Sequence, residues 1–229
     1  MKKTTALLAV FVLLFQITIS CYAEDVFKLR NGVQFGDSID DILQKETLKT
    51  YVNEEMTMVS TATTQLAGIE ESCINYWFLK DQKLNLVVYI FGPYKPKDNT
   101  DDEALIYGRV FLTDYPSIEK ALTEKYGDAL NENDEYYSIK PSLYTTYKML
   151  YLIGILSSSK KTQFKDDLLN SRIVNVNEGI VKIDHFAIQF GSAFIIHSIT
   201  YEFYTEQEIK EIIQNNKKNA VDDSVLDDI

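Results

Sequence analysis

The segment that decides the fold is residues 73–91, CINYWFLKDQKLNLVVYIF. Aromatic and β-branched side chains, which fit a pleated and half-buried surface, flank the polar run 80–83. Two apolar runs separated by a short polar run predict a β-hairpin. Both faces of the two predicted strands are largely apolar, so we expect the hairpin to lie centrally in a sheet, with helices covering one side. Gly92 and Pro93 are predicted to end it, because proline cannot donate to a strand ladder.

Three other segments have the spacing and the end residues of helices. Residues 39–45 follow Ser38, a good N-cap, and carry two aspartates in their first turn, where the helix dipole favours anions. Residues 116–126 begin with proline and stop before Gly127, and both residue types suit these positions. Residues 205–208, TEQE, form a capping-box pattern that opens a final helix.

The rest of the apolar sequence is divided mainly among strands. The predicted strands outside the hairpin include residues 61–69, 105–113, 172–176, 180–190 and 193–203. The apolar segment 142–156 is predicted to form a buried helix, with a pair of strands as the alternative. Together these elements predict an α+β protein with an antiparallel β-sheet and helices packed on one face.

The chain divides into an N-terminal leader, one domain and a tail. Residues 24–215 are predicted to form a single α+β domain. Each half of it, 24–113 and 114–215, has a short capped helix followed by a block of strands, which leaves open whether the halves are related. Residues 216–229 are polar and then acidic, and we expect them to form a flexible acidic tail.

Residues 1–23 have the features of a secretory signal peptide. A short basic start precedes an apolar run over residues 6–15, and small residues follow at the expected cleavage site. The apolar run is shorter than the roughly 20 residues that a membrane-spanning helix needs. We expect cleavage after Ala23. Lipid attachment at Cys21 is the alternative, although the residues before it match the usual lipoprotein pattern poorly. The sequence thus predicts a secreted or cell-envelope protein, with no integral membrane span in the mature chain.

The charge balance narrows the range of partners. The chain has 34 acidic and 23 basic residues and a formal net charge of −11. Nucleic acids and anionic membranes select for lysine and arginine, so neither is expected as a partner. An unknown protein or envelope component fits the charge better.

The two histidines, His185 and His197, are the first place to look for a metal site. A two-residue turn at 191–192 would pair His185 with Ser198 and would gather the apolar residues of both strands on one face. That register turns the histidines to opposite faces of the sheet. A three-residue turn would bring the histidines together, but it would separate Phe186 from the apolar face of the next strand. Because a one-residue slip moves a whole apolar set, the first register is predicted and no metal site is expected.

No catalytic or cofactor motif stands out. Cys73 begins an apolar strand, where a small buried cysteine is the ordinary interpretation. The nucleophile-elbow, phosphate-binding and zinc-protease motifs are all missing from the sequence. No cofactor and no catalytic residue are therefore predicted. Tyr136, Tyr137 and Tyr144 are the candidate binding surface for a sugar or peptide. Tyr144, Tyr147 and Tyr151 have a helical spacing, however, and tyrosines in that arrangement more often pack between helices.

Two stretches carry a resemblance to a known class of proteins. Residues 31–38, NGVQFGDS, lead into a short helix, and residues 76–84, YWFLKDQKL, form the predicted hairpin. This order resembles the helix-then-hairpin unit of small bacterial envelope proteins, namely outer-membrane assembly lipoproteins and secreted β-lactamase inhibitor proteins. The resemblance implies helices on one face of an antiparallel sheet and a sheet that binds protein. The chain departs from it in lacking a good lipoprotein signal and in having a longer passage between helix and hairpin.

The resulting functional hypothesis is a non-catalytic exported or envelope protein that binds a protein or ligand. The alternative is a secreted hydrolase of cell-wall or polysaccharide material, acting through carboxylates that the sequence cannot pair. A deep cleft holding two carboxylates with raised pKa values would favour the hydrolase.

Overall fold

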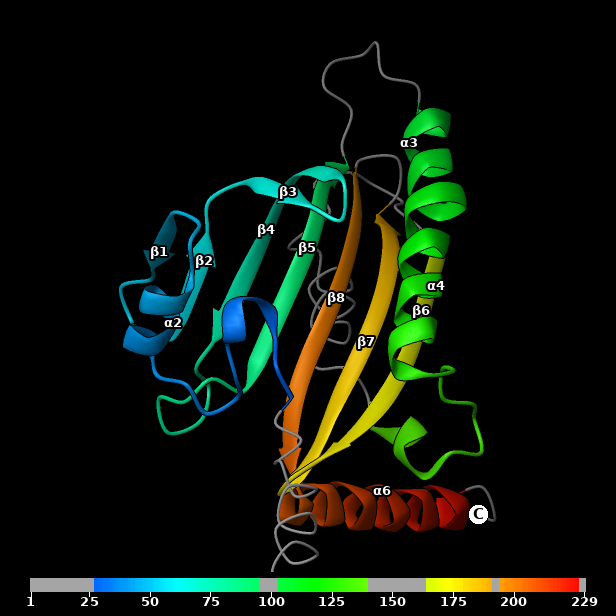
Figure 1. Cartoon of the computed structure of the whole chain (residues 1–229). Helices are drawn as coiled ribbons and strands as arrows, with labels where there is room; N and C mark the ends of the chain where they lie inside the picture. Colours follow the sequence, from blue (N-terminus) through cyan, green and yellow to red (C-terminus); the bar gives the residue numbers. More distant parts are fainter. Residues whose placement is uncertain (1–26, 95–102, 140–163, 191–193, 227–229) are drawn as a thin grey trace, which may run out of the picture.

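One antiparallel sheet organises the chain (Figure 1). The computed structural model describes residues 27–94, 103–139, 164–190 and 194–226. Over these residues the sheet has eight strands in the order β1-β2-β4-β5-β8-β7-β6, with β3 paired to β4. Together with its helices the sheet makes an α+β protein, as predicted. The strands are β1 Thr50–Val52, β2 Met58–Thr61, β3 Thr64–Leu66, β4 Ile69–Trp77, β5 Leu86–Tyr94, β6 Phe164–Val176, β7 Gly179–Phe190 and β8 Phe194–Thr205.

The predicted hairpin is formed by β4 and β5. Its register pairs Cys73 with Ile90 and Trp77 with Leu86, and a bridge between Lys80 and Lys83 closes the turn. β5 also pairs with β8, so the hairpin is central, as expected. The prediction that it ends at Gly92 and Pro93 is wrong, because β5 continues to Tyr94. A register shift after Phe91 lets the strand accommodate a proline that cannot donate to the ladder.

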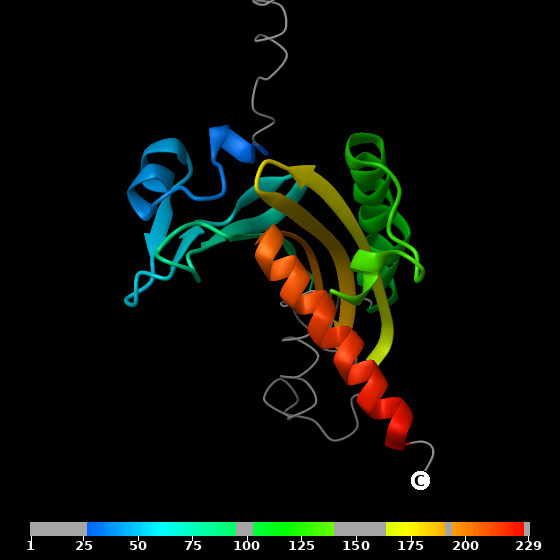
Figure 2. The same cartoon turned by 90° about the horizontal axis from the view of Figure 1, so that it is seen from below.

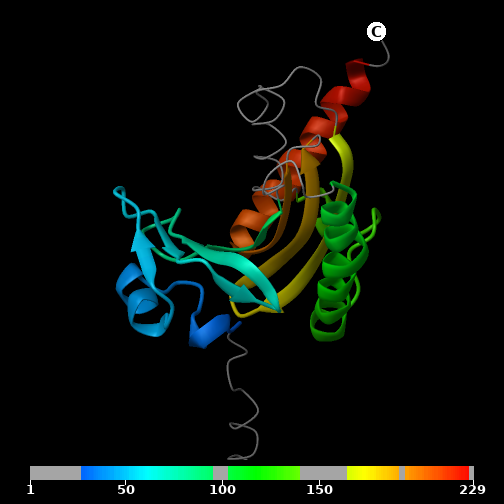
Figure 3. The same ribbon diagram turned by 90° about the horizontal axis from the view of Figure 1, so that it is seen from above.

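Two helical units cover one face of the sheet (Figure 3). The first is α2, Ile39–Lys45, which begins at the predicted N-cap Ser38 with a full capping box to Asp41. The second is a continuous helical run made of α3 Glu103–Arg109, a π-helical turn over Val110–Asp114 and α4 Tyr115–Tyr126. Gly127 ends α4 with a positive φ of 86°, as its residue type predicts. Short 3-10 turns lie at Arg30–Gly32 and Glu135–Ser138.

The strand predicted at 105–113 is wrong, since this segment is helical. Its β-branched and aromatic composition favoured a strand, but burial follows a helical pattern. Val110 and Phe111 are neighbours in sequence and are both buried, while Leu105 and Leu112 are 72% and 74% exposed. An alternating strand would have separated Val110 and Phe111 onto opposite faces.

The last helix, α6 Glu206–Leu226, crosses one end of the sheet (Figure 2). Its start is the predicted capping box, in which the Thr205 backbone N–H donates to Glu208 Oε2 (2.8 Å) and the Glu208 N–H donates to Thr205 Oγ1 (3.3 Å). Ile209 packs with Ile139, Ile180 and Tyr204 in a small second core. The backbone is helical as far as Leu226, well past the residue 215 boundary at which the sequence predicted a tail.

The main core lies between the sheet and the helices on its covered face. Alternate residues of β4, β5, β7 and β8 point into it, including Ile74, Tyr76, Val87 and Ile183, all of which are fully buried. Both halves of the chain follow the predicted layout of a helix and then antiparallel strands, and they join where β5 pairs with β8. Whether the halves share an origin stays a prediction. The predicted helix at 142–156 lies outside the described residues.

A close approach of two backbones at Gly179 gives a first stability prediction. A Cβ at Gly179 would lie 2.0 Å from the Tyr204 carbonyl oxygen. Gly179→Ala should therefore lower the free energy of unfolding by about 1–3 kcal/mol, because the paired strands must separate. Gly108→Ala is the matched control. Its Cβ meets nothing within 4 Å, and alanine favours a helix, so this variant should be neutral or up to about 1 kcal/mol more stable. Urea unfolding of the two variants measures both effects. Equal stability of the two variants would contradict the prediction.

Candidate functional site

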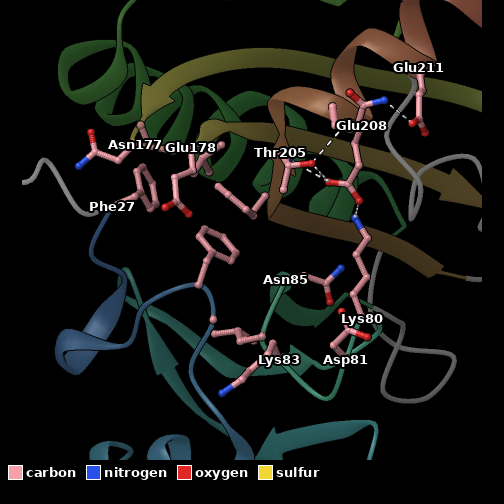
Figure 4. A pocket seen from close by; sticks show the side chains of 17 residues that line it. Phe27, Lys80, Asp81, Lys83, Asn85, Asn177, Glu178, Thr205, Glu208 and Glu211 are labelled. Carbon is pink, nitrogen blue, oxygen red and sulfur yellow. Dashed lines mark hydrogen bonds and ion pairs between the residues drawn. The ribbon is translucent and has the colours of Figure 1, made fainter.

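A cavity of about 670 Å³ opens at the end of the sheet where α6 begins (Figure 4). Four chain segments that are far apart in sequence line it. They are the N-terminal segment around Phe27 and Phe35, the β4–β5 turn, the β6–β7 turn and the first turns of α6. The pairing of β5 with β8 brings the β4–β5 turn beside the start of α6, because Leu86 stands opposite Glu202.

The floor of this end cavity is aromatic and aliphatic. The rings of Phe35 and Phe203 stack with centroids 5.8 Å apart, and Phe27 lies 6.1 Å from Phe35. Val181 and Leu84, both buried, complete the floor. This surface favours an apolar group, since water on it has few polar partners.

The rim of the end cavity is charged. Lys80 Nζ donates to Glu208 Oε1 at 2.5 Å, which ties the β4–β5 turn to α6 across the opening (Figure 4). Burial alone would raise the pKa of Glu208, but hydrogen bonds from Lys80 and Thr205 and the charge of Lys80 hold it below its ordinary value. Gln207 Nε2 donates to Glu211 Oε1 at 2.7 Å one turn further along the helix. Asp81, Lys83 and Glu178 also line the opening.

Asn85 is the buried polar residue of the end cavity. It is 5% exposed, and its Oδ1 accepts a hydrogen bond from the Leu79 backbone N–H at 2.9 Å. Its Nδ2 is buried and has no hydrogen-bond partner in the described part of the chain. Its side chain lines the cavity (Figure 4). Unsatisfied buried donors are rare, so this one marks a place where an added acceptor would be stabilising.

A second polar cluster lies beneath α4 and contains both histidines. His185 Nδ1 lies 2.7 Å from Glu119 Oε2, and His185 Nε2 lies 2.8 Å from His197 Nε2. The Tyr115 ring stacks on His185 with centroids 3.9 Å apart. Arg172 completes the cluster by binding the other Glu119 oxygen, Thr123 Oγ1 and the Gly127 carbonyl oxygen.

The prediction that the histidines face opposite sides of the sheet is wrong. Phe190 pairs with Phe194, so three residues separate the paired strand ends, and His185 stands opposite Ile199. This one-residue slip places His185 and His197 on the same face. The observed register does not expose the apolar residues that it turns to the other face of β7, because Phe186 and Ile188 are fully buried there.

Burial makes the histidines of this cluster weak bases. The pKa of His197 is lowered to about 3, mainly by burial and also by the nearby His185. Burial also lowers the pKa of His185, although Glu119 opposes the shift. The pKa of Glu119 is lowered, since hydrogen bonds and charge from His185 and Arg172 outweigh its partial burial. Both histidines are sealed from solvent, so the cluster fastens α4 to the sheet and is closed to a substrate.

The remaining residues singled out from the sequence lie apart from these two clusters. Cys73 is partly buried on β4, and burial raises the pKa of its thiol, which disfavours the nucleophilic thiolate. Tyr136 packs against the small core beside α6, and Tyr137 is exposed next to it. Tyr144 lies outside the described residues, so the tyrosine surface stays a prediction.

The sequence predicts two of the segments that line the end cavity, but not that they lie together. The capping box at Thr205 and the turn at 80–83 were both recognisable, but their proximity depends on which strands pair. Over the described ranges, no group of three or more His, Cys, Asp or Glu residues is placed to hold a metal ion. The helices of the described part include none long and apolar enough to cross a membrane.

The chain was compared with family models, with curated proteins and with solved structures, and none of them matches it.

Proposed function

We propose that this chain is a non-catalytic exported or cell-envelope binding protein and that the end cavity holds its partner. The observation that carries the proposal is the cavity, with its aromatic floor, its charged rim and the unsatisfied donor of Asn85. A space of about 300–1,000 Å³ with an apolar lining and a few placed polar groups is typical of ligand recognition.

The pKa of Glu208 supports binding over hydrolysis. A glycosidase with two carboxylates needs one whose pKa is raised, so that it can donate a proton near neutral pH. The pKa of Glu208 moves in the opposite direction, because Lys80 and Thr205 stabilise its ionised form. An ion-paired carboxylate suits the fixed polar edge of a binding site.

Export is supported by the N-terminal sequence. We expect the chain recovered from the medium or envelope of an expressing bacterium to begin at Glu24, as intact mass would show. A chain that begins at Cys21 with added lipid mass would place it in the envelope instead. Recovery of the full chain from the cytoplasm alone would contradict the export proposal.

The binding role is tested by closing the end cavity. Gln207 is exposed on the first turn of α6 and lines the opening, so Gln207→Trp would cover it without touching the core. Gln214→Trp places the same side chain two helical turns away, at an exposed position outside the lining, and is the matched control. The mature wild-type chain and both variants are used as bait for secreted and envelope material.

A partner held in the end cavity should be retained by the wild type and by the control variant Gln214→Trp. The variant Gln207→Trp should lose it. Equal retention by all three baits would show that the cavity is not the binding site. Failure of the wild type to retain any component would count against the binding proposal as a whole.

A further inference from the structure

The rim of the end cavity carries more negative than positive charge. Its carboxylates come from Asp81, Glu178, Glu208 and Glu211, and its cations are Lys80 and Lys83. Lys80 is already engaged by Glu208, which leaves three carboxylates and one lysine around the opening. The whole chain is acidic as well, with a net charge of −11, so the field at the cavity mouth attracts cations.

The aromatic floor of the end cavity favours a ligand with an apolar group. Phe27, Phe35 and Phe203 form a continuous row of rings beside the charged rim. A group that binds here gains from burying apolar area and must place its charge within a short distance of that area. A ligand with adjacent apolar and cationic groups satisfies both surfaces.

Asn85 adds a third requirement, an acceptor. Its backbone is fixed on both sides, because Asn85 N–H donates to the Trp77 carbonyl oxygen (3.2 Å) and the Phe203 N–H donates to the Asn85 carbonyl oxygen (3.0 Å). Its Oδ1 accepts from the Leu79 backbone N–H, which orients the amide, and Nδ2 has no hydrogen-bond partner in the described part of the chain. Asn85 lines the cavity, so a ligand that enters the cavity can approach this amide. A carbonyl oxygen of the ligand would satisfy Nδ2.

We infer that the end cavity takes a basic, apolar peptide segment of a partner protein. One apolar side chain lies on the Phe27, Phe35 and Phe203 floor, a backbone carbonyl accepts from Asn85 Nδ2, and an adjacent lysine or arginine faces Glu211. This inference rests on the proposed binding function and adds the chemical class of the partner. A peptide supplies all three groups at the spacing of one or two residues.

Blocked hexapeptides test the inference by calorimetry or fluorescence anisotropy on the mature chain. GLFKRG carries the apolar and cationic groups together, GLFEEG reverses the charge, and GSSKRG removes the apolar side chains. GLFKRG should bind about tenfold or more tightly than either of the others, which corresponds to about 1.4 kcal/mol. Equal binding of GLFEEG, or equal binding of GLFKRG to Gln207→Trp, would overturn the inference.

Matched charge variants test the rim. Glu211→Gln removes a carboxylate from the cavity, while Glu206→Gln makes the same change one turn earlier, at an exposed residue outside the lining. The first should weaken GLFKRG about threefold and reduce the salt dependence of its binding, since exposed ion pairs are each worth up to about 1 kcal/mol. The second should leave binding unchanged. Equal effects of the two variants would show that only the overall charge matters and would overturn the assignment.

The Asn85 side-chain amide gives a readout without mutation. Its ¹H–¹⁵N resonance should shift when GLFKRG is added and stay in place when phenethylamine is added, because the amine has a ring and a cation but no carbonyl. Phenethylamine binding as tightly as the peptide would assign the cavity to small amines instead. If a partner captured from envelope material depends on Gln207 while GLFKRG shows no advantage, the peptide class is wrong and the binding function stands. If no partner is captured and GLFKRG shows no advantage over the other peptides, both proposals are wrong.

Discussion

Arg172→Met is expected to lower the free energy of unfolding by about 3 kcal/mol. Arg172 is 1% exposed and binds Glu119, Thr123 and the Gly127 carbonyl oxygen. It therefore connects β6 to two turns of α4 and to the C-terminal end of that helix. Methionine preserves much of the apolar stem, but it leaves Glu119 without its cation and the end of α4 without a donor. Removing one partner of a buried ion pair costs more than the pair gains, because the other charge stays poorly solvated.

Arg109→Met is the control for this measurement. Arg109 is more than half exposed and its ion pair with Asp114 has an N···O distance of 3.4 Å, so the loss should be within about 1 kcal/mol. Urea unfolding of both variants gives the comparison. The double variant Glu119→Gln with Arg172→Met should recover part of the loss. Glutamine is neutral, so no carboxylate is left without its cation. A loss under about 1 kcal/mol in Arg172→Met would show that the cluster does not hold α4 to the sheet.

The stability of the chain should fall as the pH is lowered from 7 to 5. The unfolded histidines bind protons below their ordinary pKa of 6.5, while His197 in the folded chain does so only near 3 and the folded pKa of His185 is also lowered. The unfolded state thus takes up more protons in this window, so stability is complete above pH 6.5 and is lost as the pH falls towards the folded pKa values. For His197 alone the loss at pH 5 is about 2 kcal/mol.

Other buried groups of the chain act at lower pH or in the opposite sense. Glu119 has a lowered pKa and adds to the acid loss, but only below the ordinary glutamate pKa of 4.5. Burial raises the pKa of Asp184 despite Lys182, which makes its contribution to stability larger in acid. The groups around the histidines are Glu119 and Tyr115 from α4, Arg172 from β6 and Phe91 from β5. Burial raises the pKa of Tyr115, so its hydroxyl stays protonated between pH 5 and 7, and the histidines are the groups of this cluster whose lowered pKa values act in this window.

The double variant His185→Gln with His197→Gln isolates this effect. The chain has only these two histidines, and glutamine keeps an amide that can hydrogen-bond across the pair without titrating. Its free energy of unfolding, measured by urea at pH 7, 6 and 5, should lack the decline that the wild type shows over this range. The same slope in both proteins would contradict the lowered histidine pKa values.

Local signals in the sequence predicted much of the fold. The hairpin of β4 and β5, the capped starts of α2 and α6, and the glycine end of α4 each depend on residues within a few positions of one another. The sequence does not predict the helical segment 103–114, because its residue types favour a strand. Burial against the sheet determines its structure, and that depends on tertiary contacts. Register is also tertiary, and the length of one turn placed both histidines on a single face.

The candidate site was the least predictable feature. Its four segments come from residues 27–36, 80–85, 176–181 and 203–211, and no spacing in the sequence links them. Only the pairing of β5 with β8 brings the β4–β5 turn to α6. Tyr136, Tyr137 and Tyr144 lie close together in the sequence, whereas the cavity combines the rings of Phe27 and Phe35 with that of Phe203, which is distant in the sequence.

Hydrogen–deuterium exchange of the mature chain with its captured partner is the most direct test of the binding site. We expect slower exchange in residues 80–86, 176–181 and 203–211 when the partner is bound, with little change around Tyr136 and Tyr137. Protection confined to the segment around Tyr136 and Tyr137, with the cavity segments unchanged, would contradict the assignment of the end cavity as the binding site.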